Sequence, residues 1–157
     1  MKIFKWLDVQ ELLLGIGSVC HRFLSIVQNA KELWVRLETQ AEFTQQTFHK
    51  AIVSHASFFK VLTMQHSQKI VTYNSRDNYI EYSFSSCKNI VYLDLSYNTS
   101  LVTTCFLRSM TYIKILKLVG CTSICPEDTI EDLKHRKPLE VIDISECFQF
   151  NDDHCIG

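Results

Sequence analysis

Glycine and proline are scarce, with only four Gly and two Pro among the 157 residues. Flexible and semi-rigid linkers are rich in these residues, so the sequence excludes a long linker. The formal net charge of −1 excludes the broad basic surface of a typical nucleic-acid-binding domain. No apolar run approaches the roughly 20 residues of a membrane-spanning helix. With 46% apolar and 21% charged residues, the chain is predicted to form one globular domain or two small modules.

The apolar stretch Leu12–Cys20 resembles the core of a signal peptide. However, Asp8 and Glu11 precede it, where a signal peptide carries basic residues. His21 and Arg22 follow it, and no small-residue cleavage site is present. We therefore interpret this stretch as part of the folded protein, and we expect the chain in the cytoplasm, the nucleus or both.

Seven cysteines are spread from Cys20 to Cys155 without a Cys-x-x-Cys pair. This pattern does not describe a disulfide framework, so we expect reduced thiols that serve as small apolar side chains. Cys20 and His21 raise the alternative of a nucleophile–base pair. Adjacent residues on a helix point about 100° apart, and this geometry favours packing over catalysis for both residues.

Metal binding is the other chemistry that the cysteines suggest. Cys121 with Cys125, and His154 with Cys155, fit no compact zinc motif. We expect no catalytic residue, no metal and no cofactor. A thiol enzyme or redox protein stays an alternative, and it would need an exposed cysteine of low pKa.

The first forty residues have a helical pattern. Asp8 and Glu11 match a capping box, and apolar residues then recur at intervals of three and four up to Val27. Gly15 and Gly17 predict a bend or break within this segment. A further short helix is expected over residues 46–55.

Internal repeats follow residue 58. The segments NIVYLDLSYN, YIKILKLVGC and PLEVIDISEC each fit L-x-x-L-x-L-x-x-N/C, at spacings of 23 and 26 residues. Their final anchor residues are Asn98, Cys121 and Cys147, and the weaker copy SFFKVLTMQHS places Ser67 at the anchor. Each copy predicts a strand with its apolar residues pointing inward, a turn, and an amphipathic segment. A single copy cannot bury its own apolar face, so the copies are expected to stack.

Two family resemblances cover most of the chain. The segment from Lys2 to Leu37 resembles an F-box, and the repeats resemble the cysteine-containing leucine-rich-repeat branch of F-box proteins. These resemblances imply a mixed α and α/β fold, with a small helical F-box-like unit followed by a leucine-rich-repeat α/β solenoid. The expected divisions are an F-box-like module over 1–40, a helical connector or irregular first repeat over 41–58, and about four repeats over 59–157. The F-box pattern lacks its first Leu-Pro-x-Glu turn and the last repeat is incomplete, so we expect a chain truncated at both ends. The F-box resemblance is carried by Ile3, Phe4, Leu7-Asp8, Glu11-Leu12-Leu13, Val19-Cys20, Arg22-Phe23 and Leu33-Trp34.

The resemblance implies a non-catalytic role in an SCF-type (cullin–RING) ubiquitin ligase. The F-box would dock on the ligase adaptor subunit, and through it on a cullin. The repeats would hold an unknown target protein for ubiquitination and proteasomal degradation. The alternative is a leucine-rich-repeat interaction module without ligase docking.

The same resemblance supplies the candidate binding residues. Some of the adaptor-contact candidates must form the core of the small helical unit. A piece of about 35 residues cannot bury all of them, so the others face a partner or the repeats. The candidates for the adaptor contact are Ile3, Phe4, Leu7, Val9, Leu12, Leu13, Val19, Phe23 and Trp34. The candidates for target binding, on the predicted concave face, are Tyr92, Asp94, Ser96, Ile115, Lys117, Val119, Val141, Asp143 and Ser145.

Overall fold

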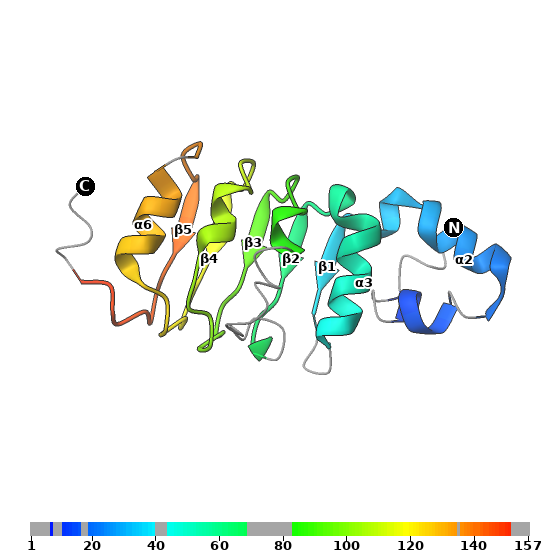
Figure 1. Ribbon diagram of the computed structural model, residues 1–157, viewed down its shortest axis with the longest axis horizontal. Coiled ribbons are helices and arrows are strands. Elements are labelled where there is room, and N and C mark those ends of the chain that lie inside the picture. The colour runs from blue at the N-terminus through cyan, green and yellow to red at the C-terminus, as the bar shows by residue number, and fades with distance from the viewer. Residues whose placement is uncertain are drawn as a thin grey trace.

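A parallel β-sheet organises the protein. The computed structural model describes residues 7, 11–16, 19–39, 44–68, 83–134 and 136–151. Five parallel strands stand side by side in the order in which they occur in the sequence, so that the sheet forms one open row (Figure 1). The strands are β1 (Arg36–Glu38), β2 (Val61–Thr63), β3 (Tyr92–Asp94), β4 (Ile115–Lys117) and β5 (Val141–Asp143).

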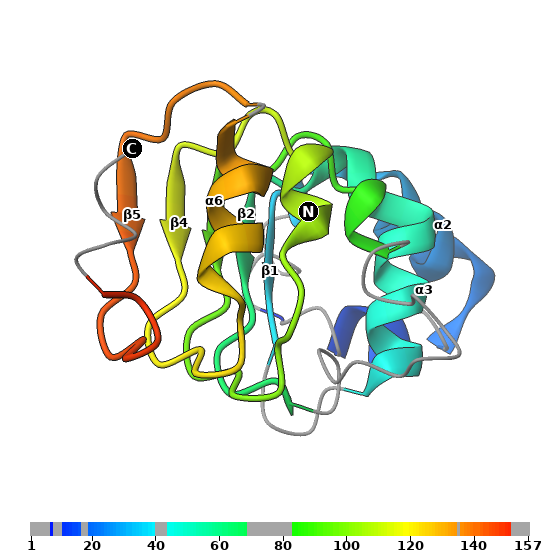
Figure 2. The same cartoon turned by 60° about the vertical axis from the view of Figure 1, so that its left-hand side comes forward.

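The longer helices beside the sheet lie on one face of it (Figures 1 and 2). The helix predicted over residues 46–55 is confirmed as α3 (Gln45–His55), where the Thr44 hydroxyl caps the start by accepting the Thr47 N–H at 3.1 Å. Pro126 begins α6 (Pro126–Lys134), as its fixed φ favours in the first turn. The other described helical segments are η2 (Glu11–Ile16), α2 (His21–Asn29), η3 (Lys31–Leu33), η4 (Ala56–Phe58) and η5 (Cys105–Arg108).

The strand register confirms the predicted repeat alignment. Leu93 pairs with Leu116, and Leu116 pairs with Ile142, so the central apolar residues of the three strong copies lie opposite one another. The weaker copy joins the same line, because Leu62 pairs with Leu93. The strands are therefore successive copies of one short unit.

The anchor residues link each unit to the one before it. The Asn98 amide donates to the carbonyls of Met64 at 2.6 Å and Leu95 at 2.7 Å. Cys121 donates its thiol to the Leu95 carbonyl at 3.1 Å, and Cys147 donates to the Leu118 carbonyl at 2.9 Å. Asn and Cys at this position therefore play the same part, since each bonds backbone carbonyl groups at the turn.

The residue before each anchor has a left-handed backbone. His66, Tyr97, Gly120 and Glu146 have φ values of 51°, 62°, 64° and 61°. Glycine alone adopts this region without steric cost. Gly120 also lies against the Tyr97 ring, which in turn stacks on His66 with 4.8 Å between ring centroids. A side chain at residue 120 would meet that ring at 2.9 Å, so close stacking of the turns requires glycine there.

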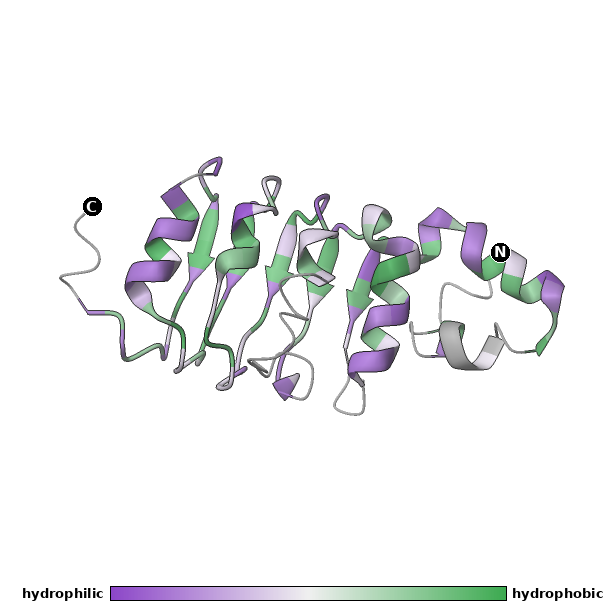
Figure 3. Ribbon diagram, in the orientation of Figure 1, coloured by the Kyte–Doolittle hydropathy of each residue, from purple (hydrophilic) through white to green (hydrophobic). Residues whose placement is uncertain are grey.

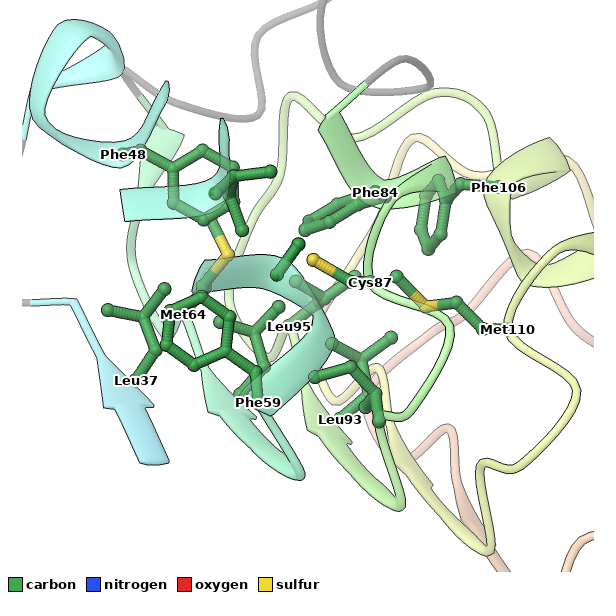
Figure 4. Close-up of a cluster of buried hydrophobic side chains, with 14 of the residues drawn as sticks. Leu37, Phe48, Phe59, Met64, Phe84, Cys87, Leu93, Leu95, Phe106 and Met110 are labelled. Atoms are coloured by element: carbon green, nitrogen blue, oxygen red, sulfur yellow. The ribbon is translucent and has the colours of Figure 1, made fainter. Parts of the chain in front are cut away.

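The core runs between the sheet and the helices (Figure 4). Phe84 sits at its centre, edge-on to Phe48 with 5.8 Å between ring centroids and tilted against Phe106 at 4.6 Å. Met64 and Leu95 supply the strand side of this cluster and are fully buried. Hydrophobic and hydrophilic residues are mixed within the strands and the helices (Figure 3), as expected of amphipathic units that bury one side by stacking.

The structure corrects the prediction that the first forty residues are helical. Residues 36–38 form β1, and Leu37 pairs with Leu62 in the shared sheet. The strand β1 and helix α3 together form a first strand–helix unit. The boundary proposed at residue 40 falls inside this unit. Of the predicted break, Gly15 lies within η2 and Gly17 lies outside the described residues. Cys20, with an extended backbone (φ −163°, ψ 161°), precedes α2.

Candidate protein-interaction surfaces

The N-terminal helices form the first candidate surface. Val19 is 64% exposed, whereas Phe23 and Leu7 are half-buried. Leu12 and Trp34 are buried within the chain itself, so neither presents its side chain to a partner in this structure. The remaining adaptor-contact candidates, Ile3, Phe4, Val9 and the side chain of Leu13, lie outside the described residues, as does the Asp8 capping box.

Trp34 joins the N-terminal helices to the sheet. Its indole N–H donates to the carbonyl of Val27, in α2, at 2.7 Å. Its ring stacks on His55, at the end of α3, with 3.6 Å between ring centroids. Phe59 packs edge-on against the same ring at 6.4 Å. Trp34 is thus a core residue that links α2, α3 and the first strands.

Burial of His55 makes this junction sensitive to protonation. The side chain is 2% exposed, and this desolvation lowers the pKa of His55 below its ordinary value of 6.5. Hydrogen bonds with backbone groups of Ala51 and Gln28 act in the opposite direction and are smaller in effect. The folded protein therefore holds His55 neutral at a pH where the unfolded chain already binds the proton.

We expect the free energy of unfolding to fall as the pH drops below about 6.5, because protons then favour the unfolded chain. Above that pH this contribution is fully present. Urea unfolding at intervals from pH 8 to pH 5 measures it. His55→Phe keeps an aromatic ring against Trp34 and should flatten the profile. An equally steep profile in His55→Phe would contradict the assignment.

The sheet face away from α3 and α6 is the second candidate surface. Strand pairing places Val61, Tyr92, Ile115 and Val141 in one row across it, which we name the apolar row. Beside it runs the charged row, formed by Glu38, Thr63, Asp94, Lys117 and Asp143. Val141 is 47% exposed, and the other members of the apolar row are half-buried. The face thus offers apolar contact with charges at one flank.

Two predicted target-binding residues contribute little surface. Asp94 and Ser96 are each 2% exposed. Asp94 accepts hydrogen bonds from the Gln65 amide at 2.7 Å and the Ser96 N–H at 3.0 Å, and its carboxylate therefore supports the turn after β3. The expectation that both side chains contact a target is corrected in this respect, since neighbouring side chains cover them.

The equivalent pair at β5, Asp143 and Ser145, is more accessible to a partner. Asp143 accepts the Ser145 hydroxyl at 2.7 Å and the Ser145 N–H at 3.1 Å. These hydrogen bonds, led by the hydroxyl and assisted by nearby Lys117, lower the pKa of Asp143. Asp143 is therefore an anion at neutral pH. Lys117 and Val119 are half-buried beside it, and both keep part of their surface at this face.

Sequence reasoning missed the contributions of β1 and β2 to this face. Arg36 extends the first row and Glu38 the second, and the two form an exposed ion pair at 2.9 Å. The signal was present, because Trp34 and Leu37 have the same three-residue spacing as Phe59 and Leu62. Assigning Trp34 to the helical leader concealed this spacing.

The described cysteines differ in burial: Cys87, Cys121 and Cys147 are buried, Cys105 and Cys125 are partly buried, and Cys20 is exposed. Burial raises the pKa of Cys87 to about 12 and that of Cys121 to about 11, and it also raises the pKa of Cys147. These thiols remain protonated at neutral pH and are poor nucleophiles. Cys20, by contrast, is exposed beside an exposed His21, so its side chain does not pack in the core of the described chain.

No helix in the described part of the chain is long and apolar enough to span a membrane. Among the same residues, no three His, Cys, Asp or Glu side chains gather as a metal site. The chain matches no protein-family model and no curated protein sequence with which it was compared.

Proposed function

We propose that this protein is a non-catalytic substrate-recognition subunit of an SCF-type ubiquitin ligase, with an F-box-like leader and leucine-rich repeats, acting in the cytoplasm or nucleus. The repeated anchor hydrogen bonds carry the proposal most strongly. Asn98, Cys121 and Cys147 occupy one structural position in successive units, and each bonds a carbonyl of an earlier unit. Repeated units joined in this way create an extended surface suited to protein recognition.

The sheet face with the apolar and charged rows is the proposed target-binding surface. Its half-exposed residues Tyr92 and Ile115 supply contact area, while Lys117 and Asp143 supply orientation by charge. Interfaces of this composition combine an apolar centre with a charged rim. The target protein would be held here and ubiquitinated by the catalytic parts of the ligase.

One observation favours the second candidate function, a repeat-based interaction protein without ligase docking. Leu12 and Trp34, two of the residues that the F-box resemblance assigns to the adaptor contact, are buried in the intrachain core. In this case the repeats would bind a partner, and no ligase subunit would accompany the protein.

Co-purification with the ligase adaptor subunit distinguishes the two functions. We expect the chain to retain the adaptor, and Val19→Glu to reduce retention about tenfold or more, because a charge would then be desolvated at the contact. Val19 is 64% exposed, so the free energy of unfolding should remain within about 0.5 kcal/mol of the original. Val53→Glu, at a valine that is 66% exposed on α3, is the matched control. Absence of adaptor binding, even after a Leu-Pro-x-Glu segment is added before Met1, would contradict ligase docking.

A further inference from the structure

A lysine precedes every described strand of the sheet. The strands are parallel, so the chain enters all of them from the same side of the sheet (Figure 1). The short segment before each strand holds one exposed lysine, and these residues form what we name the basic edge: Lys31, Lys60, Lys88, Lys114 and Lys137. The positive charge therefore recurs with the structural unit and is not the property of one loop.

Backbone hydrogen bonds between the units bring the lysines of the basic edge together. The Lys60 N–H donates to the Val35 carbonyl at 2.8 Å, and the Lys60 carbonyl accepts from the Val91 N–H at 2.8 Å. The Lys114 N–H donates to the Val91 carbonyl at 2.8 Å. Neighbouring strands lie about 4.8 Å apart, so the four steps across the sheet give the basic edge a length of about 20 Å.

Little of this charge is neutralised within the chain. Lys60 and Lys88 have no acidic partner among the described residues. Lys114 forms an ion pair with Glu140 at 2.5 Å, and both side chains are exposed. Because an exposed ion pair contributes little free energy, the Lys114 ammonium can exchange Glu140 for the carboxylate of a partner.

Aromatic rings orient two further lysines of the basic edge. The Lys31 ammonium lies 5.5 Å from the centre of the Phe58 ring, and the Lys137 ammonium lies 5.6 Å from the centre of the Tyr112 ring. Each contact joins neighbouring units. A cation above a ring still has N–H groups that point away from the ring, and these can donate to an anion at the surface.

The side of the sheet at which the strands end has the opposite charge. The strands β1, β3 and β5 end at Glu38, Asp94 and Asp143, and β4 ends at Lys117. The formal net charge of −1 therefore conceals a separation of charge across the sheet. An acidic molecule would be attracted to the basic edge and repelled from the other side, and this difference orients it on the protein.

An extended acidic protein segment fits the basic edge better than a nucleic acid does. A fully extended chain spans 3.3–3.6 Å per residue, so about six residues cover the length of the edge. Glu32 and Glu140 lie among the lysines and would repel a continuous row of phosphates. Nucleic-acid-binding domains carry broader basic surfaces, whereas the isoelectric point of this chain is about 6.6.

We propose that the basic edge binds an extended acidic segment of a partner protein, which lies across the units from Lys31 to Lys137. Its carboxylates contact Lys60 and Lys88 at the centre and replace Glu140 at Lys114. This site is separate from the sheet face assigned to the target protein. It extends the proposed function by a second point of contact, and it holds with or without ligase docking.

A pair of peptides tests the proposal on the full chain. One is a fluorescently labelled hexaglutamate, and the other is the hexaglutamine of equal length. We expect fluorescence anisotropy at about 50 mM salt to show the glutamate peptide binding about tenfold more tightly or better. The preference should shrink at about 500 mM salt, because salt screens interactions between exposed charges.

Charge reversal on the protein supplies the matched control. The double variant Lys60→Glu, Lys88→Glu should weaken binding of the glutamate peptide about tenfold, because two attractions become repulsions. The double variant Arg22→Glu, Lys50→Glu changes the net charge equally at exposed residues of α2 and α3, and its affinity should stay within about twofold of the original. Circular dichroism establishes that each variant is folded.

Several outcomes would overturn the assignment of the basic edge. These are equal binding of the two peptides, equal weakening by the two double variants, and absence of binding at millimolar peptide. A single-stranded oligonucleotide of the same number of units serves as the competitor. If it bound more tightly than the glutamate peptide, the edge would be a nucleic-acid site instead.

Discussion

Replacing Trp34 with alanine is expected to lower the free energy of unfolding by about 3–5 kcal/mol. The indole is fully buried, stacks on His55 and packs edge-on to Phe59, so its removal leaves a cavity where three elements meet. The substitution also leaves the Val27 carbonyl without its indole donor. Urea unfolding followed by circular dichroism measures the loss without depending on the tryptophan signal.

Trp34→Phe separates packing from hydrogen bonding at this junction. Phenylalanine retains an aromatic ring but cannot donate to Val27, and a single buried hydrogen bond contributes about 1 kcal/mol. We therefore expect a loss of about 1–2 kcal/mol, well below that of the alanine variant. If Trp34→Ala instead abolished adaptor binding while stability stayed unchanged, Trp34 would be a docking residue and its place in the core would be wrong.

This distinction bears on how binding experiments with the leader are interpreted. A destabilised Trp34 variant loses adaptor binding whether or not its side chain touches the adaptor. Val19→Glu does not have this ambiguity, because Val19 is largely exposed. Among the candidates from the sequence, burial therefore determines which substitutions report on docking.

The strong repeats could be predicted from the sequence because several signals coincide in them. Leu93, Leu95 and Asn98 have a spacing that fits one strand and one turn, and the same spacing recurs twice later. The paired strands β3, β4 and β5 follow this spacing residue by residue. Stacking repeats leave little freedom of register, since a shift by one residue would turn every apolar side chain outward.

The first strand could not be predicted for the opposite reason. The strand β1 has three residues, of which Leu37 alone is apolar, and it follows a helical pattern without an intervening glycine or proline. Its strand conformation depends on pairing with Val61 and Leu62, about 25 residues away. The sequence also could not predict which aspartate side chains are exposed. Asp94 and Asp143 occupy equivalent positions, but only Asp94 is covered by Gln65.

Asn98 is the second residue at which a large effect is expected. Asn98→Ala should lower the free energy of unfolding by about 2–3 kcal/mol, because the Met64 carbonyl would lose its amide donor in a buried turn. The Leu95 carbonyl is affected less, since the Cys121 thiol also donates to it at 3.1 Å. Urea unfolding followed by tryptophan fluorescence measures the change, and Cys121→Ala should have the smaller effect because Asn98 still reaches Leu95.

Asn98→Cys tests whether the anchor position accepts either residue type. The sequence itself uses cysteine at 121 and 147, where the thiol donates to carbonyl groups of the preceding unit. The buried Asn98 Oδ1 has no hydrogen-bond partner in the part of the chain that the structure describes, so cysteine would also remove an acceptor left unsatisfied there. We expect Asn98→Cys to lose about 1 kcal/mol, less than half the loss of Asn98→Ala. Equal losses in the two variants would mean that the side-chain volume of Asn98, and not its hydrogen bonds, holds the turns together.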